Sequence, residues 1–216
     1  MAIRHIVWDW NGTLFDDFTA VYQAACQLFA ARGLPAVTAE QYRAAYTRPI
    51  DAFYRRLFGR ELTAAEMSGL DADFHDAYRR ALPTVGLAPD ARAALASWRA
   101  GGGSQSLLSM FRHAELTALV GKFGLAGEFT RIEGLVGPGG GRKAEHLVAH
   151  LAALDVDPAE VMLVGDSLDD AEAAAEAGAR CVLYDGGSHT RATLESHGAP
   201  VADTLTRALH HAAARW

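Results

Sequence analysis

The sequence is poor in cysteine. Its two cysteines, Cys26 and Cys181, are far apart and flanked by apolar residues. Two isolated positions of this kind are not typical of a disulfide or of a metal-binding pair. We therefore expect two buried free thiols in a reducing, cytoplasmic environment.

Long apolar runs and basic runs are also missing. No apolar segment approaches the roughly 20 residues of a membrane-spanning helix, and Arg4, His5 and Asp9 do not fit a secretory signal. The net charge is −6 without a basic cluster, so a nucleic-acid surface is not supported. With 216 residues, 50% of them hydrophobic, the chain can build one core and a small appendage. We expect a cytoplasmic monomer or homodimer that binds neither membrane nor nucleic acid.

Residues 3–17 predict a buried strand that ends in a carboxylate. Ile3–Trp8 is mostly apolar and rich in β-branched and aromatic residues, which is typical of a strand covered on both faces. Asn11 and Gly12 then tolerate the backbone angles of a sharp turn. This places Asp9 at the carboxyl end of the strand, where open α/β sheets bind ligands. The alternative is a strand that simply ends in an Asx turn.

Residues 17–82 contain only helical patterns. The apolar spacing predicts helices over 17–32, 38–47, 50–58 and 63–82. Capping-box patterns open two of these helices, at Thr38 and at Thr63. This stretch is therefore predicted to be an all-helical insertion after the first strand.

From residue 83 onward, predicted strands alternate with helices. The strands are expected over 104–109, 129–133, 161–164, 180–184 and near Val201. The helices are expected over 89–100, 112–123, 142–154, 168–177 and 190–196, with one more after the last strand. Alternation of this kind indicates parallel strands joined by helical crossovers. The predicted fold class is α/β, a Rossmann-like doubly wound parallel sheet, with a core domain over 1–16 and 83–216 and a helical cap over 17–82.

Ser109 and Lys143 are candidates for binding an anion at the carboxyl edge of this sheet. Ser109 ends the second strand, where its hydroxyl and the backbone N–H of Met110 suit a phosphate oxygen at the next helix N-terminus. An ordinary N-cap serine is the alternative. Lys143 starts a helix after a glycine-rich loop and is one of two lysines in the chain. A Walker A loop is excluded, because Gly141-Arg142-Lys143-Ala144 lacks the Gly-Lys-Ser/Thr ending.

The turn Gly165-Asp166-Ser167-Leu168-Asp169-Asp170 places three carboxylates after an apolar strand. Carboxylate oxygens are the ligands that Mg²⁺ prefers, which favours a metal site. The alternative is a helix start with acids that suit the helix dipole.

Together these motifs resemble the haloacid dehalogenase superfamily of phosphotransferases. The four motifs are Asp9-Trp-Asn-Gly-Thr-Leu, Ser109, Lys143 and Gly165-Asp166-Ser-Leu-Asp-Asp170. They occur in the family's order and span essentially the whole chain. The resemblance implies the fold of that family, with residues 17–82 as its C1 cap.

The resemblance also implies a reaction. Asp9 is then the nucleophile that forms an aspartyl phosphate, and Thr13 braces its turn. Ser109, Met110 and Lys143 hold the oxygens of the transferring phosphoryl group. The implied activity is that of a phosphatase for a small phosphorylated metabolite, similar to phosphoglycolate phosphatases.

The implied cofactor is Mg²⁺, which offsets the repulsion between carboxylate and phosphate. Its ligands are Asp9, the backbone carbonyl of Asn11 and Asp166. Asp170 either binds the metal, directly or through water, or positions Lys143.

Asn11 departs from the family pattern. Phosphatases and mutases of the family usually carry an aspartate there, which protonates the leaving oxygen and later activates water. An amide does neither, so we expect slow turnover or a preference for good leaving groups. The alternative is a catalytically degenerate member that binds a phosphometabolite or a partner. Asn11 is either native to a phosphatase-like bacterial subgroup or an introduced substitution.

Other branches of the family fit less well. A phosphomutase needs the missing acid/base in both halves of its cycle. Dehalogenases carry an aromatic residue at position 11. Phosphonoacetaldehyde hydrolases use a cap lysine, and residues 17–82 contain none.

Substrate choice is assigned to the cap and to the loops that face it. Arg48, beside Pro49 at a predicted helix break, is the main specificity candidate. Further candidates that carry or can carry a positive charge are Arg43, Arg55, Arg56, His113 and His189. Solvated helix faces and satisfied histidines are the alternatives.

Overall fold

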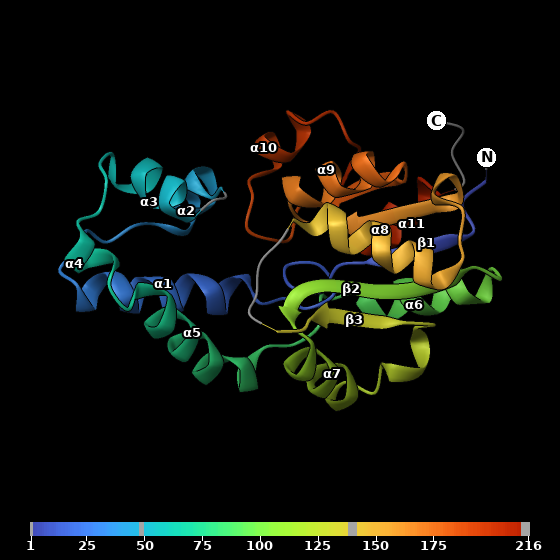
Figure 1. Ribbon diagram of the computed structural model, residues 1–216, viewed down its shortest axis with the longest axis horizontal. Coiled ribbons are helices and arrows are strands. Elements are labelled where there is room, and N and C mark those ends of the chain that lie inside the picture. The colour runs from blue at the N-terminus through green and yellow to red at the C-terminus, as the bar shows by residue number, and fades with distance from the viewer. Residues whose placement is uncertain (1, 48–49, 138–141, 213–216) are drawn as a thin grey trace.

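The computed structural model describes residues 2–47, 50–137 and 142–212. Figure 1 shows a sheet with helices on both of its faces and, at one end, a separate group of helices. The first and the last described residues lie at the opposite end of the sheet from that group.

The sheet is parallel throughout, and its strands alternate with helices along the chain. In the described residues it has six strands in the order β3-β2-β1-β4-β5-β6. They are β1 (His5–Trp8), β2 (Ser104–Arg112), β3 (Ile132–Leu135), β4 (Val161–Gly165), β5 (Arg180–Tyr184) and β6 (Val201–Ala202). The predicted doubly wound α/β sheet is confirmed. Its winding direction reverses between β1 and β4, which is where sheets of this kind bind ligands.

Helices cover both faces because β1 is apolar on both sides. Ile6 and Trp8 pack against α6 (Ala91–Ala100), α7 (His113–Lys122) and α11 (Leu205–His210). Val7 points the other way and packs against α8 (Lys143–Leu154) and α9 (Leu168–Ala177). A shorter helix, α10 (Arg191–Glu195), packs beside β5 through Leu194. The central strands are therefore fully enclosed, and their carboxyl ends open toward the helical group.

The helical group lies between β1 and α6 in the sequence. It consists of α1 (Phe18–Ala31), α2 (Ala39–Ala45), α3 (Ile50–Phe58), α4 (Ala64–Met67) and α5 (Leu70–Ala81). Phe29, Tyr42 and Phe53 are among the buried residues of an aromatic cluster that belongs to these helices. Because the group has an apolar cluster of its own, we propose the division into a cap over 17–82 and a core over 1–16 and 83–216.

Several predicted boundaries are wrong. The helix expected over 63–82 is two helices, because Gly69 has a left-handed backbone (φ 70°) that ends the first turn and starts α5. The capping boxes at Thr38 and Thr63 are both present. β1 begins at His5, two residues later than predicted, and β3 is displaced from 129–133 to Ile132–Leu135.

The structure also bears on two expectations that were drawn from composition. Cys26 and Cys181 are free, but each is half-buried rather than fully buried. Among the described helices, none is both long and apolar enough to cross a membrane.

A chain of hydrogen bonds joins β1, β2 and α8 inside the core. His5 Nε2 and His150 Nε2 each lie 2.8 Å from Ser106 Oγ, and His150 Nδ1 lies 2.7 Å from Glu133 Oε2. A carboxylate only accepts, so His150 donates from Nδ1 and accepts the Ser106 proton at Nε2, which leaves His5 Nε2 to donate to Ser106. This assignment applies to neutral rings, and burial lowers the pKa of His150 as well as that of His5. Burial, together with neighbouring His150, lowers the pKa of His5 to about 4.

This arrangement predicts loss of stability in mild acid. The unfolded chain protonates His5 near its ordinary pKa of 6.5, whereas the folded chain resists until about 4. The stabilisation is therefore complete above pH 6.5 and is lost as the pH falls from 6.5 to 4. We expect the pH slope of the unfolding free energy to flatten in His5→Gln, by up to about 1.4 kcal/mol per pH unit.

Urea unfolding at a series of pH values from neutral to mildly acidic measures this slope. The matched control is His197→Gln, since His197 is exposed. The other ionisable groups contribute equally to both variants, so their effect cancels. Identical slopes for the two variants would contradict the assignment.

Candidate active site

The site is built where β1 and β4 lie side by side. Asp9 follows β1 and Asp166 follows β4, and the backbone N–H of Asp9 donates to Val164 O at 2.9 Å. The two carboxylates are buried, with 6% and 7% of their residue surface exposed. The parallel register of two neighbouring strands therefore brings both acids to one point at the carboxyl edge of the sheet.

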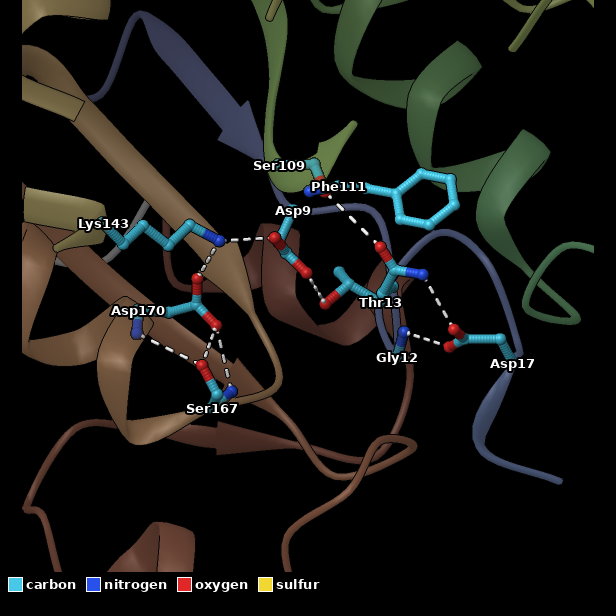
Figure 2. A network of polar contacts seen from close by, with 10 residues as sticks. Asp9, Gly12, Thr13, Asp17, Ser109, Phe111, Lys143, Ser167 and Asp170 are labelled. Atoms are coloured by element: carbon cyan, nitrogen blue, oxygen red, sulfur yellow. Dashed lines mark hydrogen bonds and ion pairs between the residues drawn. The ribbon is translucent and has the colours of Figure 1, made fainter. Parts of the chain in front are cut away.

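Lys143 brings a positive charge to this point from the first turn of α8. Figure 2 shows its ammonium between the carboxylates of Asp9 and Asp170, with which it forms ion pairs. Burial by itself would lower the pKa of Lys143, but Asp170 and Asp9 more than offset this and raise it. Lys143 is therefore charged and holds the ends of β1, α8 and α9 together.

Asp170 serves two partners at once. One oxygen pairs with Lys143, and the other accepts from the backbone N–H of Ser167 at 3.0 Å and from its hydroxyl at 2.6 Å. The bond from the Ser167 backbone N–H is half of a capping box at the start of α9. The box fixes the carboxylate, so that the lysine is positioned by a rigid partner.

The acids form a cluster that suits a cation. Among the described residues, Asp9, Asp166 and Asp170 offer oxygens that all lie within 4.8 Å of one another. Burial raises the pKa of Asp9 to about 7, with Asp170 adding to the shift and Lys143 opposing it. Burial, followed by the charges of Asp9 and Asp170, also raises the pKa of Asp166 well above its ordinary value. Lys143 neutralises only part of this charge, so the cluster fits a divalent metal such as Mg²⁺.

Two glycines make room for the Asp166 carboxylate. A Cβ at Gly12 or at Gly187 would overlap its atoms. Gly12 also has a left-handed backbone (φ 71°), which a turn of this kind requires. Beside Gly187, the backbone N–H of Ser188 donates to Asp166 Oδ2 at 3.1 Å. The loop after β5 is therefore part of the site.

The loop after β1 is held by its own side chains. The Thr13 hydroxyl donates to Asp9 Oδ2 at 3.4 Å, as expected of a bracing residue. The Gly12 N–H donates to Asp17 Oδ1 at 2.8 Å (Figure 2). The Asn11 amide nitrogen donates to Asp17 Oδ2 at 2.8 Å and to the Tyr78 hydroxyl at 2.9 Å. This loop is thus linked to helix α5 of the cap.

Ser109 lies at the site, but not at a helix N-terminus. The predicted strand end at Ser109 is wrong, because β2 continues to Arg112 and α7 begins only at His113. Its buried Oγ accepts from the Phe111 N–H at 3.1 Å and lies 3.5 Å from Asn11 Oδ1. Met110 is half-buried within this irregular end of β2. Any anion contact here therefore uses the strand end and the serine hydroxyl rather than a helix dipole.

The cap arginines that are candidates for substrate specificity differ in their surroundings. Arg48 lies outside the described residues. Arg55 and Arg56 are exposed, and Arg55 pairs with Glu61 at 3.5 Å. Arg43 is different, because its Nε donates to Gly187 O at 3.0 Å, on the loop that also holds Asp166. The cap therefore touches the core at the site through Arg43.

The two histidine candidates also differ in their surroundings. The buried ring of His189 lies 5.0 Å from the ring of Tyr46 of the cap, centroid to centroid. His113 Nδ1 accepts from the Gly134 N–H at 3.2 Å, so it is a satisfied histidine. Of the two, His189 is the one that packs between cap and core.

Comparison with known proteins places these features in a family. The family described as haloacid dehalogenase-like hydrolase matches residues 3–178, a span that includes all four motifs. The chain belongs to the haloacid dehalogenase-like hydrolases.

Individual relatives agree with this membership. The N-acetylmuramic acid 6-phosphate phosphatase of Pseudomonas aeruginosa is 29% identical over 230 aligned positions, which cover 97% of each chain. A haloacid dehalogenase-like family protein from Streptococcus pneumoniae has the same fold, with a TM-score of 0.82 at 18% identity over 97% of this chain and 98% of that one. A predicted phosphoglycolate phosphatase from Haemophilus somnus gives a TM-score of 0.74 at 17% identity over 97% of both chains.

Sequence reasoning missed two groups at this hydrolase site. The first is Asp17 with Tyr78, for which the acidic pair after the first motif was the one available signal. The second is the loop at Gly187 and Ser188, which carries no motif. Both reach the site through tertiary contacts, which local patterns do not report.

The buried ion pairs predict a large stability loss on removing the lysine charge. Lys143→Met leaves buried carboxylates without their cation, so we expect the free energy of unfolding to fall by about 3 kcal/mol or more at neutral pH. Urea unfolding in the presence of a chelator measures this fall in the free energy of unfolding. The control is Arg207→Met, because the Arg207–Asp203 pair is exposed and contributes little. Equal losses in the two variants would contradict the burial argument.

Proposed function

We propose that this hydrolase is a Mg²⁺-dependent phosphatase that acts on a small phosphorylated metabolite through an aspartyl-phosphate intermediate on Asp9. The observation that carries the proposal is the position of Asp9. Its buried carboxylate follows β1 and is paired with Lys143, and one of its oxygens lies within 4.8 Å of an oxygen of Asp166 and of Asp170. A carboxylate nucleophile beside a metal cluster and a fixed cation suits phosphoryl transfer.

The metal ligands in this proposal are Asp9, Asp166 and the backbone carbonyl of Asn11. Asp170 acts mainly through Lys143, to which it is paired. When bound, Mg²⁺ neutralises the charge between nucleophile and phosphate, which are both negative. Burial, with a smaller contribution from neighbouring carboxylates, raises the pKa values of Asp9 and Asp166, and a bound cation would offset both effects.

The reaction has two displacements at phosphorus. An oxygen of Asp9 attacks, the bond to the leaving oxygen breaks, and that oxygen takes a proton from solvent. Water then attacks the phosphorus of the aspartyl phosphate, which returns Asp9 as a carboxylate, and both protons of that water leave with the phosphate. Lys143 and Ser109 donate hydrogen bonds to the phosphoryl oxygens, where negative charge accumulates.

Asn11 sets the expected rate profile. An amide neither supplies a proton to the leaving oxygen nor removes one from water. Good leaving groups need no such help, so aryl phosphates are expected to react faster than alkyl phosphates. The second displacement lacks its usual base, so the phosphoenzyme is expected to accumulate.

The first alkyl substrates to examine come from the relatives. The curated relative is named for a phosphorylated amino sugar, N-acetylmuramic acid 6-phosphate. A structural relative is named for phosphoglycolate. We take sugar 6-phosphates and phosphoglycolate as the substrate panel, with p-nitrophenyl phosphate as the aryl reference.

Phosphate release with this panel tests the proposal. We expect activity that requires Mg²⁺, stops on chelation and returns when Mg²⁺ is added back. Asp9→Asn should lower kcat by at least about 10³-fold, the scale of removing a nucleophile. The matched control is Asp16→Asn, because Asp16 is an exposed aspartate close to the same loop.

Intact-mass measurement after rapid quenching should detect phosphate on wild type and none on Asp9→Asn. If no substrate on the panel is turned over and Asp9→Asn is indistinguishable from wild type, the phosphatase proposal fails. Tight Mg²⁺-dependent binding of a phosphometabolite without product would then favour a binding protein on the same scaffold.

A further inference from the structure

Asp17 is a buried carboxylate whose hydrogen-bond donors are neutral groups. It is 2% exposed and lies immediately before α1. The Gly12 N–H donates to Oδ1 at 2.8 Å, while the Asn11 amide and the Tyr78 hydroxyl donate to Oδ2 at 2.8 and 2.5 Å. A buried carboxylate is tolerated when donors of this kind surround it, and hydrogen bonds to it are strong. These contacts therefore fix the geometry of the loop that carries Asn11.

The network determines which way the Asn11 amide faces. When ionised, the Asp17 carboxylate only accepts, and Tyr78 donates its hydroxyl proton to it. Toward Asn11, both groups are therefore acceptors. Both protons of the amide nitrogen are used on that side. A flipped amide would set its oxygen against two acceptors. The oxygen of Asn11 therefore faces Ser109, whose hydroxyl lies 3.5 Å away.

The hydroxyl that completes the network comes from the cap. Tyr78 lies on α5, 61 residues after Asp17, and its ring is buried at 4% exposure. Helices α1 and α5 pack along each other, which holds the tyrosine over the loop. Through this hydroxyl, α5 contributes to the geometry of the loop that carries Asn11.

We propose that Asp17 and Tyr78 are positioning residues that hold the Asn11 amide with its oxygen toward Ser109 and the transferring phosphoryl group. The inference rests on the proposed phosphatase function. The surroundings of position 11 are complementary to an amide, so asparagine belongs there. An aspartate at position 11 would place a carboxylate oxygen, which only accepts, against the carboxylate of Asp17, which also only accepts. In this chain, position 11 orients the attacking water by accepting its hydrogen bond, and it does not exchange a proton with it.

Exchanging donor and acceptor tests the pairing. Asn11→Asp and Asp17→Asn each place like groups opposite each other, whereas the double variant restores one donor and one acceptor in reversed positions. We expect both single variants to unfold at lower urea concentration than wild type, and the double variant to recover much of the loss. Additive losses in the double variant would overturn the pairing.

Tyr78→Phe tests the positioning role without adding a charge. We expect kcat for p-nitrophenyl phosphate with Mg²⁺ to fall about tenfold, the scale of one hydrogen bond to a charged group, while KM changes less than about twofold. The matched control is Tyr22→Phe, which loses a hydroxyl that donates to Val37 O at 2.7 Å within the cap. Its kcat and KM should equal those of wild type.

The kinetic outcomes separate the two proposals. Equal kcat in Tyr78→Phe and Tyr22→Phe would overturn the positioning role, as would an Asn11→Asp variant faster than wild type. A wild type that releases no phosphate would overturn the phosphatase function instead. In that case the unfolding measurements still decide whether Asn11 and Asp17 are paired as donor and acceptor.

Discussion

The Lys143 ammonium between the carboxylates of Asp9 and Asp170 is the contact on which the site depends. The parallel order of the sheet places β4 beside β1, so Asp166 reaches the same point from the next strand. Negative charge then exceeds the single charge of the lysine. Buried charge of this kind is costly unless it is paired. The excess of buried negative charge therefore lowers stability and at the same time supports the proposed divalent-metal site, so both follow from one arrangement of charges.

Much of this could be predicted because its signals are local. β1 and β4 are short apolar runs that end in an aspartate, and parallel strands bring their carboxyl ends to one edge. The Thr38 and Thr63 capping boxes are encoded within four residues and are both present. Lys143 stands at a helix start in the sequence and in the structure. Local patterns therefore predict the type of fold and the acids and lysine that converge in it.

Other features depend on contacts that no local pattern reports. Gly69 sits inside a helical pattern, where a glycine is compatible with both a continuous helix and a break. The extension of β2 to Arg112 follows from pairing with β3, which continues to Leu135. Asp17 and Tyr78 are 61 residues apart, and their hydrogen bond exists only after α5 packs on α1. Residue types near a motif are thus predictable, whereas their partners are set by tertiary packing.

The departure at position 11 follows the same electrostatic logic as the rest of the site. An aspartate there would add another negative charge to a region that already buries Asp9, Asp166 and Asp17. An amide adds none, and its two protons form hydrogen bonds with the Asp17 carboxylate and the Tyr78 hydroxyl. The same residue, Asn11, therefore accounts both for the missing acid/base group and for these hydrogen bonds. Because Asp17 and Tyr78 both lie within the proposed cap, their hydrogen bonds tie the Asn11 amide to it. In our proposal, packing of the cap on the core is therefore part of the geometry that orients Asn11.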